Sequence, residues 1–194
     1  LKGIVAITGK TPLYEKLDLR EKTSVQNFFK KHNDIDGVIH FAASKAVGES
    51  VENPLLYYEN NINTLVYILQ ELQQKAEANF IFSSSCTVYG QAEKMPITEN
   101  APIQPAMSPY GNTKQIGEEI ITEVCKVSTI NSILLRYFNP IGAHPSAEIG
   151  ELPIGVPQNL IPYITQTGIG LRQELSVYGN DYPTPDGTCI RDYI

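Results

Sequence analysis

Apolar residues follow two alternating spacings along this chain, from about residue 13 to residue 138. Short apolar runs predict strands, which cover residues 13–17, 38–42, 80–82 and 133–138. Segments with apolar residues at helical spacing predict helices between them, over residues 23–32, from 54 to about 72, and from 108 to about 127. Strands that alternate with helices of this length indicate βαβ units and a parallel sheet.

The predicted helices begin with residues that suit a helix start. Pro54 and Pro109 stand in first turns, where the fixed φ of proline and its missing N–H fit the backbone. Ser108 is the predicted N-cap of the last of these helices, and Thr23 or Ser24 that of the first.

Beyond Asn139 the chain becomes rich in proline and glycine, and only residues 159–167 keep a helical spacing. Because it begins at Leu1 and stops after Ile194 without a closing element, we expect an incomplete protein. The predicted fold class is α/β: a doubly wound, Rossmann-like parallel sheet, incomplete at the N-terminus, with the start of a smaller domain. Helices should cover both faces, and ligands should bind beyond the carboxyl ends of the strands.

Composition and charge exclude several classes of function. The 194 residues carry a net charge of −6, which argues against nucleic-acid binding because that favours a basic face. No apolar run reaches the ~18 residues of a membrane helix. Cys86, Cys125 and Cys189 lie far apart, which indicates free thiols and a cytoplasmic protein. The histidines lack metal-ligand spacing, so we predict no metal site, and His40 is expected to be a satisfied strand residue.

Tyr110 and Lys114 are the first candidate chemistry. They are four residues apart on a predicted helix, so they share a face with Cβ atoms about 5–6 Å apart. An ammonium about 5 Å from a phenolate stabilises it by roughly 3 kcal/mol at an effective dielectric near 20. That lowers the phenol pKa by about two units, to a value still above neutral. A second nearby cation would lower it further, so that Tyr110 could act as a base. Taken alone, the pair fits two surface residues better than a catalytic pair, and an ordinary turn explains Ser85 equally well.

The glycine-rich turn of a dinucleotide-binding fold is not found. Such a turn reads G-x-x-G-x-x-G between a strand and a helix. Gly9 is followed by Pro12, which stands where a second glycine is required. The pyrophosphate cradle therefore either lies outside these residues, or the protein binds no dinucleotide.

Six stretches match a known family in its own order: residues 38–50, 57–61, 80–90, 110–114, 136–145 and 179–194. They resemble the extended short-chain dehydrogenases/reductases and, within them, the UDP-galactose 4-epimerases. The Tyr-x-x-x-Lys spacing marks only the superfamily, whereas the last two stretches are more specific to the epimerases. The chain departs from the family at its ends, where the glycine-rich start and the rest of the sugar pocket are missing.

The resemblance implies a role for each matched position. Tyr110 would take the proton of the sugar 4-hydroxyl, Lys114 would hold the nicotinamide ribose, and Ser85 would orient the hydroxyl. The implied NAD-binding residues are Asp18, Leu19, Phe41, Ala42, Ala43, Ser44, Lys45, Asn60, Ser83, Tyr110, Lys114, Tyr137 and Phe138. The implied UDP-sugar-binding residues are Lys45, Ser85, Tyr110, Asn139, Asn159, Leu160, Ser176, Val177, Tyr178 and Arg191.

The implied activity is NAD-dependent 4-epimerisation of a UDP-hexose, UDP-galactose to UDP-glucose, through a transient 4-keto sugar. Residues 1–140 would form the dinucleotide-binding domain, without its first βα unit, and residues 141–194 part of the substrate domain. A homodimer through the helices that begin near Pro54 and Ser108 is expected. Neither nucleic acid nor a membrane is expected as a partner.

Other functions stay open. A nucleotide-sugar 4,6-dehydratase would carry an Asp-Glu pair directly after Ser85, where this chain has Cys86 and Thr87. An epimerase for UDP-N-acetylhexosamines or UDP-uronates would share the matched stretches. Cys86 as a second base is less favoured than Cys86 as a small core residue. A non-catalytic nucleotide-binding module would have no need for Ser85, Tyr110 and Lys114 together, and the chain by itself could be inactive.

Overall fold

The computed structural model describes residues 1–92 and 94–194, which divide into two units. One unit is Lys16–Tyr137. The other combines Leu1–Glu15 with Phe138–Ile194.

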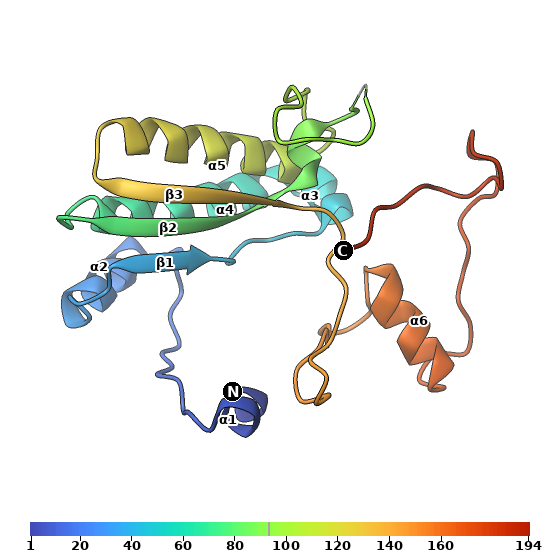
Figure 1. The fold of residues 1–194 in the computed structure, drawn as a ribbon, viewed down its shortest axis with the longest axis horizontal. Helices are drawn as coiled ribbons and strands as arrows, with labels where there is room; N and C mark the ends of the chain where they lie inside the picture. Colours follow the sequence, from blue (N-terminus) through green and yellow to red (C-terminus); the bar gives the residue numbers. More distant parts are fainter. Residues whose placement is uncertain (93) are drawn as a thin grey trace. The chain divides into compact units, whose positions relative to one another are not determined.

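The unit Lys16–Tyr137 contains a parallel sheet of β1 (Gly37–His40), β2 (Ala78–Ser85) and β3 (Ile130–Tyr137), in that order (Figure 1). This confirms three of the predicted strands and their parallel pairing. The strand predicted at residues 13–17 is absent, because these residues form neither helix nor strand. That run is interrupted by charged residues and offers little apolar surface to bury.

Four α-helices belong to the described part of this unit: α2 (Lys22–Lys31), α3 (Val47–Glu52), α4 (Pro54–Leu72) and α5 (Pro109–Lys126). A short 3₁₀ helix, η1 (Cys86–Tyr89), follows β2. Ser108 caps α5 as predicted, since its Oγ accepts a hydrogen bond from Gly111 N at 3.1 Å. The N-cap of α2 is Glu21 instead of Thr23 or Ser24, and α3 was not predicted.

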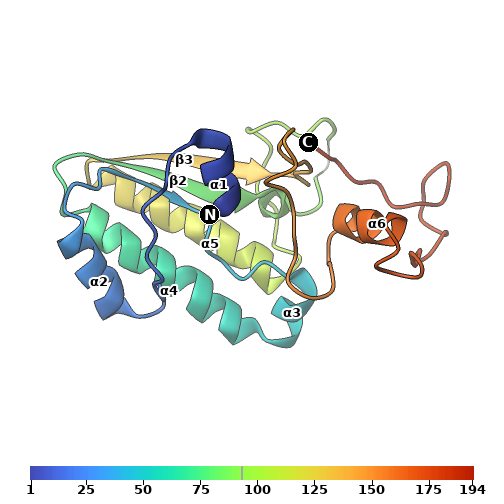
Figure 2. The ribbon, with the colours of Figure 1, turned by 90° about the horizontal axis from the view of Figure 1, so that it is seen from below.

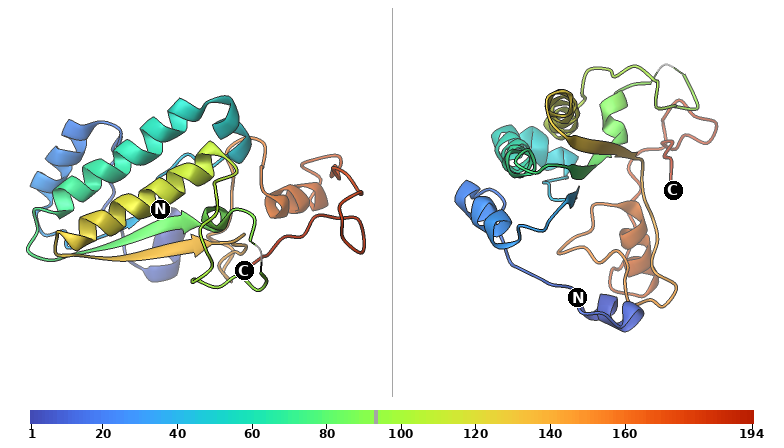
Figure 3. Two further views of the ribbon diagram at one scale, coloured as in Figure 1. Left: turned by 90° about the horizontal axis from the view of Figure 1, so that it is seen from above. Right: turned by 60° about the vertical axis from the view of Figure 1, so that its left-hand side comes forward.

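Helices α2, α4 and α5 all lie on one face of the sheet, as Figures 2 and 3 show. Their apolar side chains build one core with β2 and β3, made of Val25, Phe29, Leu65, Ile68, Leu69, Leu72, Ala78, Phe80, Phe82, Ile121 and Ile130. The parallel sheet flanked by helices agrees with the predicted fold class, but helices on both faces were expected and those of the described part of this unit cover one face. The strand order explains the difference: right-handed crossovers that step in one direction place every helix on the same face.

The opposite face of the sheet carries a row of isoleucines in register. Ile39 pairs with Ile81, and Ile81 with Ile133. Ile39 is 60% exposed and Ile133 57%. Alternation along the strands places these side chains away from the core.

The second unit contains α1 (Lys2–Thr8) and α6 (Leu160–Gly168). Helix α6 agrees with the predicted helical spacing at 159–167, whereas α1 was not expected. Asn139 forms a parallel bridge with Tyr193, in which its backbone bonds Asp192 O and Ile194 N. Across the residues that the structure describes, every helix is too short or too polar to cross a membrane.

Candidate active site

Three serines at the carboxyl end of β2 line one side of the candidate site. Ser83, Ser84 and Ser85 close the strand, and the chain then turns into η1. Ser85 is the N-cap of η1, and its Oγ accepts a hydrogen bond from Thr87 N at 3.2 Å. Ser85 is therefore held by strand pairing on one side and by a cap on the other.

Lys114 reaches this strand end from α5. Its Nζ donates a hydrogen bond to Ser83 O at 2.7 Å and lies 4.8 Å from the centre of the Phe82 ring. The same Nζ lies 5.8 Å from the centre of the Tyr110 ring. Tyr110 and Lys114 thus share the inward face of α5, as their spacing predicted, and Lys114 is buried.

The electrostatics of Tyr110 differ from the expectation. Burial raises the pKa of Tyr110, because it disfavours the phenolate, and a hydrogen bond with Ser85 only partly opposes this. Burial also lowers the pKa of Lys114 to about 8. The expectation of a lowered Tyr110 pKa was therefore wrong, since burial raises it.

A buried amide fixes the loop that follows β1. Asn61 Oδ1 accepts a hydrogen bond from Ser44 N at 2.8 Å, and Asn61 Nδ2 donates to Ser44 O at 3.0 Å and to Thr113 Oγ1 at 3.1 Å. Asn60 Nδ2 adds a bond to Ser44 Oγ at 2.8 Å. This clamp ties the loop to α4 and to the residue before Lys114. Asn61 was not among the predicted site residues, although an amide inside a helix is a recognisable signal.

Thr87 lies beside the candidate site. Its Oγ1 is buried and has no hydrogen-bond partner among the described residues. It follows Ser85 by two positions, next to the N-terminus of α5, where an ideal Cβ on Gly111 would contact it at 3.5 Å. Buried hydroxyls are nearly always satisfied, so Thr87 Oγ1 is an exception among the described residues beside Ser85.

The remaining predicted residues of this unit have varied surroundings. Asp18 pairs with Arg20 at 2.7 Å, which lowers the pKa of Asp18 to about 2. Leu19 packs against the core, and Tyr137 is the register partner of Ser85. The residues predicted after β1 are partly or fully exposed, namely Phe41, Ala42, Ala43 and Lys45.

The predicted residues of the second unit form no single cluster among its described residues. Asn139 Nδ2 donates to Asp192 O at 2.7 Å, which places Asn139 beside the segment that carries Arg191. Asn159 Nδ2 donates to Glu151 Oε1 at 2.7 Å. Phe138 is half-buried, and the others are exposed, namely Leu160, Ser176, Val177, Tyr178 and Arg191.

Known proteins resemble the chain over its whole length. UDP-glucose 4-epimerase of Mus musculus is 46% identical to it, and UDP-glucose 4-epimerase 2 of Arabidopsis thaliana is 49% identical. The alignments cover 100% of this chain but only 56% and 55% of those proteins. The chain thus spans a little over half the length of these curated relatives.

Solved structures agree with the sequence comparison. The crystal structure of UDP-glucose 4-epimerase from Bifidobacterium longum in complex with NAD+ and UDP matches with a TM-score of 0.94 and 44% identity, over 100% of this chain and 58% of that one. The enzyme from Stenotrophomonas maltophila, with bound NAD and formylated UDP-arabinopyranose, matches with a TM-score of 0.90 and 44% identity, over 100% of this chain and 57% of that one.

A family model provides the last comparison. The model described as GDP-mannose 4,6 dehydratase matches residues 8–194. The match covers both units and all the stretches on which the resemblance rested. The chain therefore belongs to this family, within the extended short-chain dehydrogenases/reductases.

Proposed function

We propose that this protein catalyses the NAD-dependent 4-epimerisation of a UDP-hexose, interconverting UDP-galactose and UDP-glucose. The observation that carries the proposal is the meeting of Ser85, Tyr110 and Lys114 at the carboxyl end of β2. The names of the relatives support the same activity.

The donor groups around β2 suit a dinucleotide. Lys114 has three N–H donors, and among the described residues one of them is directed at Ser83 O. Its other donors and the hydroxyl of Ser44 would hold ribose hydroxyls of NAD, with Asn60 supporting Ser44. When bound, NAD would accept the hydride from sugar C4 and return it to the opposite face of the ring.

Tyr110 would act as the base for the sugar 4-hydroxyl. Ser85 would accept or donate a hydrogen bond at that hydroxyl and fix its direction. Because burial raises the pKa of Tyr110, its phenolate needs more positive charge than Lys114 supplies. The cation of oxidised nicotinamide would provide that charge, so proton removal would depend on the oxidation state.

The two units would divide the binding work. Lys16–Tyr137 would form most of the dinucleotide-binding domain, with Asp18 and Leu19 at the adenine, the loop 41–45 along the cofactor, and Tyr137 with Phe138 near the nicotinamide. Residues 141–194 would belong to the substrate domain. The residues that would bind UDP lie in this domain or just before it, and are Asn139, Asn159, Leu160, Ser176, Val177, Tyr178 and Arg191. A guanidinium fits two phosphate oxygens, which favours Arg191 at the diphosphate.

An epimerase is favoured over a dehydratase by the residues that follow Ser85. A 4,6-dehydration needs an acid that expels the 6-hydroxyl, and Cys86 and Thr87 supply no carboxylic acid at these positions. The family model is described by a dehydratase activity, but the relatives reported above are named epimerases.

We also infer a cytoplasmic homodimer that pairs through α4 and α5. Support comes from exposed apolar side chains near the starts of these helices: Leu55 is 79% exposed and Met107 72%. Cys86, Cys125 and Cys189 form no disulfide among the described residues, which fits a reducing compartment. Sedimentation at micromolar concentration tests the dimer, and a monomer there would contradict it.

The test of the proposed activity uses the whole protein. It is incubated with UDP-galactose and, separately, with GDP-mannose, and the products are separated by chromatography. We expect UDP-glucose from the first, no 4-keto-6-deoxy sugar from the second, and NAD released on denaturation. A preparation that carries NAD but forms no UDP-glucose would overturn the proposal.

A further inference from the structure

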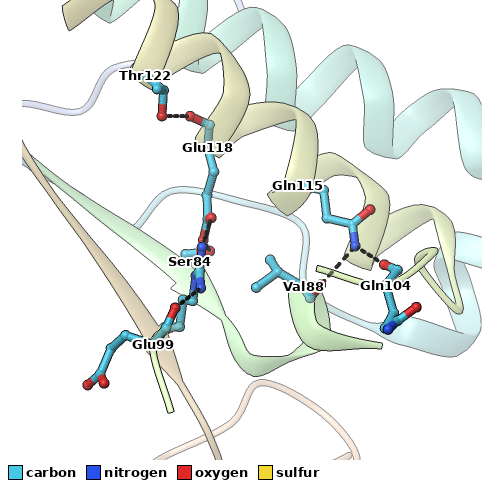
Figure 4. A network of polar contacts seen from close by, with 8 residues as sticks. Ser84, Val88, Glu99, Gln104, Gln115, Glu118 and Thr122 are labelled. Atoms are coloured by element: carbon cyan, nitrogen blue, oxygen red, sulfur yellow. Dashed lines mark hydrogen bonds and ion pairs between the residues drawn. The ribbon is translucent and has the colours of Figure 1, made fainter. Parts of the chain in front are cut away.

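A buried carboxylate on α5 joins three elements beside the candidate site. Glu118 lies one helical turn after Lys114 and is 4% exposed. Its Oε1 accepts hydrogen bonds from Ser84 Oγ at 2.5 Å and from Arg136 Nε at 2.9 Å, and its Oε2 accepts one from Arg136 Nη2 at 2.7 Å. Figure 4 shows Glu118 and Ser84 pointing toward one another between α5 and β2. Glu118 thus connects α5, β2 and β3.

Each partner of Glu118 adjoins a residue of the candidate site. Ser84 stands between Ser83, whose carbonyl accepts the Lys114 hydrogen bond, and Ser85. Arg136 precedes Tyr137, the register partner of Ser85. A shift of Ser84 would therefore move both neighbouring serines relative to α5.

The ion pair is better suited to fixing geometry than to adding stability. Removing a carboxylate and a guanidinium from water is costly, and well-packed apolar residues in their place often give a fold of equal stability. A bidentate guanidinium–carboxylate pair, however, fixes both distance and orientation. Arg136 is held further by the Tyr89 ring, whose centre lies 4.9 Å from its guanidinium carbon.

We propose that Glu118 is a positioning residue for the epimerisation proposed above: by holding Ser84 against α5, it fixes Ser83 and Ser85 relative to Lys114 and Tyr110. Glu118 itself is bonded to Ser84 and Arg136 and acts through them. The expected effect on kcat rests on the proposed function. The expected effect on the positions of Ser83 and Ser85 rests on the contacts alone.

The kinetic test compares Glu118→Gln, Ser84→Ala and their combination in the whole protein. We expect Glu118→Gln to lower kcat by about 10- to 100-fold with KM within about twofold, since a geometry needed in the reaction is lost. The double variant should be no slower than Glu118→Gln, because both changes weaken the same contact between positions 84 and 118. Glu119→Gln removes the same charge from the neighbouring, exposed position and should leave kcat unchanged.

A second readout follows the position of Ser85 without activity. The Thr87 amide donates to Ser85 Oγ, so its hydrogen–deuterium exchange should be faster in Glu118→Gln and Ser84→Ala and unchanged in Glu119→Gln. Ser84→Ala keeps the ion pair and so keeps the test valid if Glu118→Gln does not fold.

The outcomes separate the two proposals. A lower melting temperature with unchanged kcat and unchanged Thr87 exchange would show that Glu118 only stabilises the fold, and would overturn the inference. If the wild type forms no UDP-glucose, the proposed activity fails. The exchange result then decides alone: faster exchange supports the positioning of Ser85, and unchanged exchange overturns it.

Discussion

The ammonium of Lys114 donates its hydrogen bond to the backbone carbonyl of Ser83, 2.7 Å away. This carbonyl belongs to the last residues of β2, so the charge is held at the strand end that carries Ser85. Burial lowers the pKa of Lys114 to about 8, which means that the fold holds an ammonium where it is poorly solvated. A shifted pKa at the carboxyl edge of a parallel sheet is typical of a functional site.

Replacing Lys114 by methionine should stabilise the protein while removing its activity. The folded protein binds the Lys114 proton below pH about 8, and the unfolded chain up to about 10.5. The charge therefore costs on the order of 3 kcal/mol below pH 8, and this cost disappears as the pH rises toward 10.5. Melting temperatures at pH 7 and pH 10 should show a gain for Lys114→Met that shrinks at the higher pH. A variant that melts lower at pH 7 would contradict the prediction.

His40 should make the protein less stable in mild acid. Its ring stacks on Phe80 and Phe82, and burial, followed by the charge of Lys114, lowers its pKa to about 4. Between pH 6.5 and 4 the unfolded chain binds this proton and the folded chain does not, so stability falls as the pH falls. The loss should reach about 2 kcal/mol at pH 5.

The variant His40→Phe keeps an aromatic ring and cannot titrate. Its melting temperature should fall less than that of the wild type between pH 7 and pH 5. His144→Gln, at an exposed position of the other unit, should follow the wild type. Parallel curves for all three proteins would exclude His40 as the cause.

Gly117 allows α5 to pack closely on α4 and β2. A Cβ at this position would lie 2.9 Å from Phe82 Cζ and 3.3 Å from Leu65 Cδ2. Gly117→Ala should therefore destabilise the protein by about 1–3 kcal/mol, despite the helix propensity of alanine. Gly48, inside α3, has no atom within 4 Å of such a Cβ, so Gly48→Ala should be neutral or stabilising by up to about 1 kcal/mol. Equal effects in thermal unfolding would contradict this packing argument.

The sequence predicted the elements whose signals are local. Helices α4 and α5 carry apolar residues at helical spacing over many turns, with proline in the first turn. Strands β2 and β3 contain the short apolar runs 80–82 and 133–135. The short helices α1 and α3 were missed because so few residues give no clear period. The side of the sheet that the helices occupy depends on strand order, which no local pattern contains.

The candidate site was predictable in the same uneven way. The spacing of Tyr110 and Lys114 predicts a shared helix face, and the structure agrees. The pKa of Tyr110 depends on burial by residues distant in sequence, so its direction was missed. Glu118 and Arg136 lie 18 positions apart, and only the packing of α5 on β3 brings them together.

In the proposed reaction the phenol of Tyr110 takes the proton of the sugar hydroxyl, and Tyr110→Phe removes this proton acceptor. The measurement is kcat for conversion of UDP-galactose to UDP-glucose by the whole protein, with Tyr67→Phe on α4 as the matched control. We expect kcat to fall by about 10²–10⁴-fold in Tyr110→Phe and to stay unchanged in Tyr67→Phe. If kcat of Tyr110→Phe equals that of the wild type, Tyr110 is not the base.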